Sequence, residues 1–168
     1  MNAAELRAVQ GPLKEKYRND PDSAATPVRA SATFAEDGLT ATVDGFAGTV
    51  RAGLHPAAGG SGDDACSGDM LLEALLGCAG VTLRTVATAM GLQVRSARLE
   101  ATGSFDVRGT LGVDRTVPVG VTGIEITAEV DTDADDEALA KLARSTERYC
   151  VVARSLAEPP TFTVRRAG

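Results

Sequence analysis

The 168-residue chain has no tryptophan and few aromatic side chains of any kind. Aromatic residues make up only 4% of the chain, so we expect a core built from alanine, valine and leucine. The rest of the composition, 43% hydrophobic and 24% charged, is typical of a soluble globular protein. The length suits one domain with a substantial core.

Clustered basic residues are also missing. Seventeen lysines and arginines stand against 23 aspartates and glutamates, which gives a formal net charge of -6. Proteins that bind the phosphates of nucleic acids need lysine and arginine gathered on one face. We therefore expect no nucleic-acid partner.

The first ten residues lack a basic stretch followed by an apolar run, so they do not predict a signal peptide. The longest apolar stretch, residues 70–90, has about the length of a membrane span, but Glu73 and Arg84 lie within it. We interpret this stretch as a buried helix of a soluble protein. The sequence thus predicts a cytoplasmic location and no membrane partner.

Histidine and cysteine are scarce. The chain has one histidine, His55, and three cysteines, Cys66, Cys78 and Cys150, without a CxxC or HxxxH spacing. Zinc sites usually show such spacings, so we expect no metal. Because structural disulfides are rare in a reducing cytoplasm, the cysteines are structural thiols or redox groups.

Hydrophobic periodicity predicts a first helix over residues 4–20, where apolar side chains recur every three or four positions. Pro12 could interrupt this helix, because an interior proline removes a backbone hydrogen bond. We expect two parts of the chain: an N-terminal helical extension over residues 1–24 and a domain over residues 25–168.

Within the domain, alternating and helical patterns follow one another, which predicts the α+β class. A hairpin turn is expected at Glu36-Asp37-Gly38, and a connection rich in turns over residues 109–118. Strands are expected at residues 28–34, 39–43, 46–54, 94–106, 123–130 and 161–165. Helices are expected from Ser67 or Asp69 to Met90 and over residues 132–148, with a short helical turn ending at Ala157.

Cys78 is the most informative residue, because it lies well inside the apolar helix. Helical spacing places Leu71, Leu75 and Thr82 on the same face, toward an interior or an interface. Cys150 follows 72 positions later, where the second long helix ends. A lone buried cysteine is usually a small hydrophobic residue. Two cysteines in such settings raise a second interpretation, a thiol pair that cycles between dithiol and disulfide.

The segments around these cysteines, residues 68–78 and 150–156, resemble those of the osmotically inducible protein and organic hydroperoxide resistance family (OsmC/Ohr). The order of elements and the cysteine spacing agree, so the resemblance extends over roughly residues 28–166. It implies an OsmC-like fold, with antiparallel sheets around two long central helices. It also implies an intertwined homodimer with two active sites at the interface.

The resemblance further implies a thiol peroxidase active in the oxidative stress response. Cys78 would attack an organic hydroperoxide and become a sulfenic acid, and Cys150 would resolve it as a disulfide. An external dithiol, such as a lipoylated protein, would then reduce the disulfide, and no cofactor would be required. The catalytic candidates are thus Cys78 and Cys150, and the expected partners are a second copy, a hydroperoxide and a dithiol reductant.

Members of the family that act as peroxidases use an arginine in the first hairpin turn and a glutamate at the start of the cysteine helix. Here Glu36 and Gly68 hold those positions, and Val151 follows the second cysteine, where a proline is common. Arg51 and Asp69 are further catalytic candidates, because they could supply the missing charges; Arg29 and Arg148 are alternatives to Arg51.

Two residues keep open interpretations. His55 could stabilise a thiolate or shuttle a proton if its loop covers Cys78; otherwise it is a surface histidine. Cys66 is an alternative resolving thiol or an incidental loop cysteine. The alternative function is a dimer without peroxidase activity that binds a small hydrophobic or electrophilic molecule in its interface pocket.

Overall fold

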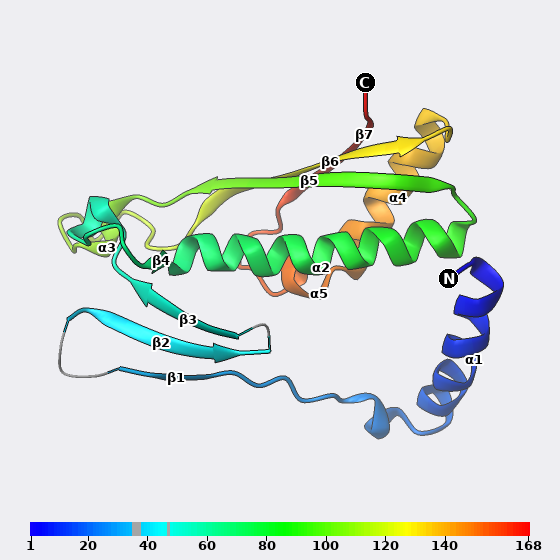
Figure 1. Cartoon of the computed structure of the whole chain (residues 1–168), viewed down its shortest axis with the longest axis horizontal. Coiled ribbons are helices and arrows are strands. Elements are labelled where there is room, and N and C mark those ends of the chain that lie inside the picture. The colour runs from blue at the N-terminus through cyan, green and yellow to red at the C-terminus, as the bar shows by residue number, and fades with distance from the viewer. Residues whose placement is uncertain (35–37, 47) are drawn as a thin grey trace. The chain divides into compact units, whose positions relative to one another are not determined.

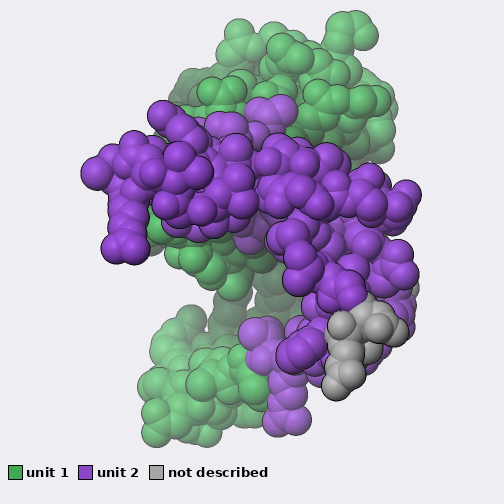
Figure 2. All heavy atoms as spheres, turned by 90° about the vertical axis from the view of Figure 1, so that its left-hand side faces the viewer, with its two compact units in different colours: residues 1–27, 75–101, 125–168 green, residues 28–74, 102–124 purple. Residues whose placement is uncertain are grey.

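The computed structural model describes residues 1–34, 38–46 and 48–168. They form two compact units (Figure 2). Unit 1 contains residues 1–27, 75–101 and 125–168, and unit 2 contains residues 28–74 and 102–124. Three long elements contribute residues to both units: α2 (Ser67–Met90), β5 (Val94–Ser104) and β6 (Thr122–Thr132).

Unit 2 contains a four-stranded sheet in the order β1-β2-β3-β4. Its strands are β1 (Ser31–Thr33), β2 (Thr40–Gly45), β3 (Gly48–Gly53) and β4 (Ala65–Cys66). The first three are antiparallel neighbours, as the expected hairpin requires for β1 and β2, and lie side by side in Figure 1. The predicted turn at Glu36 and Asp37 lies outside the described residues.

Two short helices complete unit 2: η2 (Pro56–Ala58) and α3 (Val107–Thr110), the second of which overlaps the predicted connection rich in turns. Side chains start both, since the His55 imidazole accepts a hydrogen bond from the Ala57 amide and Asp106 accepts one from Arg108. Such single turns are too short to carry a hydrophobic period, so pattern alone cannot predict them.

Unit 1 contains a second sheet in the order β5-β6-β7, with β7 at Thr161–Arg166. Strands β6 and β7 are parallel, with Glu125 opposite Thr161 and Val130 opposite Arg166. The pair β3 and β4 is also parallel. The expectation of antiparallel sheets is therefore wrong for these two pairs, because a crossover returns the chain in the same direction.

The crossover between β6 and β7 contains α4 (Asp136–Tyr149) and α5 (Val151–Arg154). The predicted helix over residues 132–148 begins four residues later than expected, since β6 continues to Thr132 and Asp135 caps α4. The Asp135 carboxylate accepts a hydrogen bond of 2.8 Å from the amide of Ala138.

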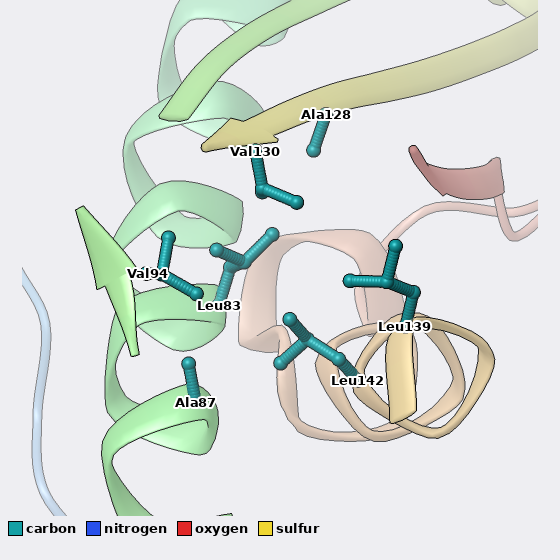
Figure 3. Packing of buried hydrophobic residues seen from close by; sticks show 7 residues of the cluster. All are labelled: Leu83, Ala87, Val94, Ala128, Val130, Leu139 and Leu142. Carbon is teal, nitrogen blue, oxygen red and sulfur yellow. The ribbon is translucent and has the colours of Figure 1, made fainter. Parts of the chain in front are cut away.

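The core of unit 1 lies among α2, β5, β6 and α4 (Figure 3). Its buried residues are all aliphatic, as the composition predicts: Leu83, Ala87, Val94, Ala128, Val130, Leu139 and Leu142. On α2 the fully buried stripe is Leu75, Ala79, Leu83 and Ala87. This stripe is displaced by one residue from the face predicted through Cys78 and Thr82, so Cys78 lies at its border and is only half-buried.

Helix α2 is long and apolar enough to cross a membrane, although a core helix satisfies the same condition. Its start at Ser67 and its end before Gly91 match the prediction. Gly91 has a φ of 72°, the left-handed conformation that commonly follows the last turn of a helix.

The N-terminal helix α1 (Ala3–Asn19) and the turn η1 (Pro21–Ala24) belong to unit 1. Asn2 and Glu5 form a reciprocal capping box at the start of α1. The helix continues through Pro12, so the predicted interruption does not occur.

Candidate functional site

The candidate site is built around Cys78 in the middle of α2. Thr82 lies one helical turn later, and its hydroxyl forms a hydrogen bond with the Cys78 thiol. The period that keeps Leu75 and Ala79 in the core also places Cys78 and Thr82 together along the border of the buried stripe. The sequence predicted this neighbourhood correctly from helical spacing.

Cys150 meets Cys78 from the junction between α4 and α5. It follows the last residue of α4 and precedes the first residue of α5, and only 1% of its surface is exposed. The side chains of the two cysteines are hydrogen-bonded to each other, and all three cysteines of the chain are free thiols. The thiol pair predicted from the sequence is therefore brought together within unit 1.

The surroundings of Cys78 favour its ionised form. Burial raises the pKa of this thiol, but hydrogen bonds from the backbone of Val152, from the Cys150 thiol, from Thr82 and from the backbone of Val151 outweigh that effect. The net result is a Cys78 pKa below its ordinary value. The groups that lower this pKa are hydrogen-bond donors, and no cation among the described residues contributes to the shift.

The pKa of Cys150 is shifted in the opposite direction. Burial raises the pKa of the Cys150 thiol, and its hydrogen bond to Cys78 and the negative charge of the Cys78 thiolate raise it further. Backbone hydrogen bonds from Ala153 and Val152 compensate only in part. In this pair Cys78 is consequently the thiol that loses its proton first, while Cys150 remains a neutral donor beside it.

This arrangement provides one thiol with a lowered pKa and a second thiol in contact with it. A thiolate is a nucleophile, and its oxidation product condenses readily with a neighbouring thiol. The geometry is thus suited to chemistry that ends in a Cys78–Cys150 disulfide.

Arg51, a predicted catalytic candidate, belongs to unit 2. It lies on β3 opposite Thr42, and its guanidinium donates a hydrogen bond to the Asp64 carboxylate. The arginine side chain is 62% exposed, whereas that of Asp64 is 12% exposed. The described partner of the Arg51 guanidinium is therefore the Asp64 carboxylate, which belongs to the same unit.

The remaining candidates, His55, Asp69 and Cys66, also belong to unit 2 and line one cavity there. Cys66 ends β4 directly before α2, and Asp69 is exposed in the first turn of α2. The structure therefore gathers the predicted residues into two groups, the cysteine pair in unit 1 and these three residues in unit 2.

Sequence reasoning did not identify the backbone of Val151 and Val152 as part of the site. Their amides face Cys78 because α5 starts directly after Cys150, a turn of four residues with no periodic signal. Val151 has a backbone N–H to donate, whereas a proline at this position would have none. The valine in place of a proline is visible in the sequence, but the contact of its amide with Cys78 depends on the fold.

Among the residues that the structure describes, no group of three or more histidine, cysteine, aspartate or glutamate side chains is placed to hold a metal ion. The described groups that act on the pKa values of the cysteine pair are sulfur, hydroxyl and backbone amide groups.

Comparison with protein families shows that the family described as "OsmC-like protein" matches residues 60–165. The matched range contains α2, α4 and both residues of the cysteine pair. No curated protein matches the sequence.

Solved structures of similar fold include an OsmC-like protein from Mycoplasma pneumoniae, with a TM-score of 0.67 and 16% identity over 84% of this chain and 96% of that chain. An organic hydroperoxide resistance protein from Elizabethkingia anophelis has a TM-score of 0.68 and 15% identity over 85% and 98%. The organic hydroperoxide resistance protein OhrB of Bacillus subtilis has a TM-score of 0.55 and 17% identity over 84% and 98%. At these identities the likeness concerns the fold.

Proposed function

The chain belongs to the OsmC-like protein family, as its sequence indicated, and from this premise we propose that it is a thiol-dependent peroxidase that reduces organic hydroperoxides. The observation that carries the proposal is that the pKa values of two thiols in contact are shifted in opposite directions. The Cys78 pKa is lowered while the Cys150 pKa is raised, so one thiol is prepared to attack and the other to resolve. Solved structures of similar fold include organic hydroperoxide resistance proteins, which supports the same class of substrate.

The reaction has three balanced steps. The Cys78 thiolate attacks the terminal oxygen of a hydroperoxide; the S–O bond forms, the O–O bond breaks, and the alkoxide leaves and takes a proton to become an alcohol. The Cys150 thiol then attacks the Cys78 sulfenic acid, forming the disulfide and releasing water. An external dithiol, such as a lipoylated protein, finally reduces the disulfide by thiol exchange and is itself oxidised.

Activation in this chain rests on hydrogen bonds instead of the arginine and glutamate of the resembling peroxidases. Backbone amides and a hydroxyl stabilise a thiolate by the same electrostatic principle as a cation, although each contributes less. The amide of Val151 is a donor that a proline at this position cannot provide. The valine therefore supports the proposal that the thiolate is stabilised within its own protomer.

We propose in addition that two copies form a homodimer through α2. Only 22% of the most apolar 18-residue window of this helix is buried in the chain, and Val81 is 70% exposed. An exposed apolar face of this kind is typical of a protein–protein interface. A second copy would cover it, as the family resemblance implies, and would remove water from the surroundings of Cys78.

The test is turnover of cumene or tert-butyl hydroperoxide by the reduced protein in the presence of dihydrolipoamide. We expect Cys78→Ser to lower turnover by at least about a hundredfold, since the nucleophile is lost. Cys150→Ser should stop multiple turnover but still form a sulfenic acid that dimedone traps on Cys78. Cys66→Ser is the matched control and should retain wild-type turnover.

Intact mass should show a Cys78–Cys150 disulfide in wild type after one equivalent of hydroperoxide. A wild-type protein that leaves the hydroperoxide unreacted and Cys78 unmodified would exclude the peroxidase. The alternative, an inactive dimer that binds a small hydrophobic or electrophilic molecule, would then be preferred, because no cation among the described residues contributes to lowering the Cys78 pKa.

A further inference from the structure

Unit 2 contains a cavity that the peroxidase chemistry does not use. Its volume is about 360 Å³, within the range of small-molecule sites. The apolar part of its wall includes Leu72, Phe105, Val107 and Val121, and the polar part includes His55 and Cys66. A second cavity of about 220 Å³ shares His55, Cys66, Phe105 and Val121. Both hollows thus border the same thiol and the same imidazole.

The imidazole of His55 is held in a defined orientation. Its Nδ1 accepts a hydrogen bond of 3.1 Å from the amide of Ala57, so the neutral ring carries its proton on Nε2. Phe105 packs edge to face against the ring, with centroids 5.4 Å apart and an interplanar angle of 90°. Nε2 makes no hydrogen bond to another described residue, and it is therefore the nitrogen that can donate to a ligand.

Cys66 and Gly68 lie side by side in the wall of the cavity. A methyl group added at Gly68 would lie 3.6 Å from the Cys66 sulfur and 3.9 Å from a methyl carbon of Val121, without a clash. Cys66 is half-buried and free, and it is the only cysteine of unit 2. A reaction at this site has to be complete with one thiol, which favours addition over disulfide cycling.

We propose that this cavity binds small α,β-unsaturated carbonyl compounds with an apolar body, and that Cys66 captures them covalently. The sulfur forms a bond to the β-carbon while the C=C π bond breaks and its electron pair moves toward the carbonyl oxygen. The Nε2–H of His55 donates to that oxygen, and the thiol proton ends on the α-carbon. The product is a saturated thioether, so no oxidant or reductant is consumed.

The apolar body of the ligand determines the preference for this site. An aromatic or alkyl group packs against Leu72, Phe105 and Val121, and burial of that surface stabilises the complex before addition. The smallest unsaturated aldehyde, acrolein, lacks such a body and would lose this contribution. Selectivity for the larger compound is therefore the signature of the cavity.

The experiment compares adduct formation at Cys66 by cinnamaldehyde and by acrolein in the reduced full-length chain. Adducts are located by peptide mass spectrometry, and each rate is divided by that of the same aldehyde with glutathione. We expect saturable kinetics with cinnamaldehyde and a normalised rate at least about tenfold above that of acrolein. Hydrocinnamaldehyde, which lacks the C=C bond, should slow the reaction competitively.

Two variants test the geometry. Gly68→Ala fills part of the cavity and should slow cinnamaldehyde addition while leaving alkylation of Cys66 by iodoacetamide unchanged. His55→Phe keeps a ring against Phe105 but removes the Nε2–H donor. It should slow the addition of both aldehydes to Cys66 relative to the alkylation of Cys66 by iodoacetamide. Thermal unfolding of each variant checks that unit 2 remains folded.

A linear dependence of the rate on cinnamaldehyde concentration, with no preference over acrolein, would overturn the proposal. This result is independent of the peroxidase. Cys66→Ser should lose the adduct and keep hydroperoxide turnover, whereas Cys78→Ser should lose turnover and keep the adduct. Loss of one activity without the other therefore shows which of the two proposals is wrong.

Discussion

At Cys78, hydrogen-bond donors take the place that a positive charge holds in the resembling peroxidases. The described groups that lower the pKa of this thiol are two backbone amides, one hydroxyl and one neutral thiol. A single hydrogen bond to an ionised group contributes more than one between neutral groups. Removing any one donor should therefore shift the Cys78 pKa measurably without abolishing the site.

Thr82→Val removes the hydroxyl that interacts with Cys78 and preserves the shape of the side chain. Because the hydroxyl lowers the pKa, we expect the Cys78 pKa to rise and the thiolate fraction at neutral pH to fall. The pH profile of iodoacetamide alkylation at Cys78 should move to higher pH. Thr85→Val is the matched control, since the Thr85 hydroxyl donates instead to the Val81 carbonyl at 2.8 Å.

Val151→Pro tests the backbone donor directly. Val151 is the first residue of α5, a position that accepts proline, and Cys150 has the extended backbone (φ -73°, ψ 105°) favoured before proline. We expect the fold to be retained and the alkylation profile of Cys78 to move to higher pH. Val151→Ala keeps the amide and should leave the profile in place; an equal shift in both variants would contradict the assignment.

At the scale of elements, the long periodic segments could be predicted and the short ones could not. Ser67, Gly91 and the apolar run between them predict α2, and the four-residue spacing predicts that Thr82 accompanies Cys78. By contrast, the two residues of β4 acquire their strand conformation from pairing with β3. The contact of Val151 and Val152 with Cys78 likewise depends on the α4–α5 turn, which tertiary packing fixes.

Helix α4 contains a buried hydroxyl that none of the described residues satisfies. Thr146 is fully buried one turn before Cys150, and its Oγ1 has no hydrogen-bond partner in the described part of the chain. A buried unsatisfied hydroxyl costs free energy, so Thr146→Val should raise the free energy of unfolding by about 1 kcal/mol. Urea denaturation followed by circular dichroism measures this change.

Thr132→Val is the matched comparison for that measurement. Thr132 is 6% exposed, and its hydroxyl donates to the Gln93 carbonyl at 2.6 Å and accepts from the Ala134 amide at 3.2 Å. Loss of this hydroxyl should lower the free energy of unfolding by about 1–3 kcal/mol, because the Gln93 carbonyl and the Ala134 amide lose their partner. A decrease in both variants would indicate that Thr146 has a partner in solution.

At the scale of the whole molecule, the chain leaves apolar surface exposed in each unit. Val81 on α2 belongs to unit 1, while Phe34 (86% exposed) and Phe46 (fully exposed) belong to unit 2. Contiguous exposed apolar surface on a protein often marks an interaction site. The uncovered surface is consistent with a second copy of the chain, the association proposed above.

Val81→Glu tests whether α2 is that interface. A carboxylate on a face covered by apolar residues would be desolvated without a partner, so we expect the dimer to dissociate. Sedimentation velocity at micromolar concentration should show the mass of a monomer for this variant and of a dimer for wild type. Val113→Glu introduces the same charge at a residue that is 74% exposed in unit 2 and should leave the dimer intact. If the Val81→Glu variant sediments as a dimer, as wild type does, α2 is not the interface. A second copy bound through α2 would then not be what removes water from the surroundings of Cys78.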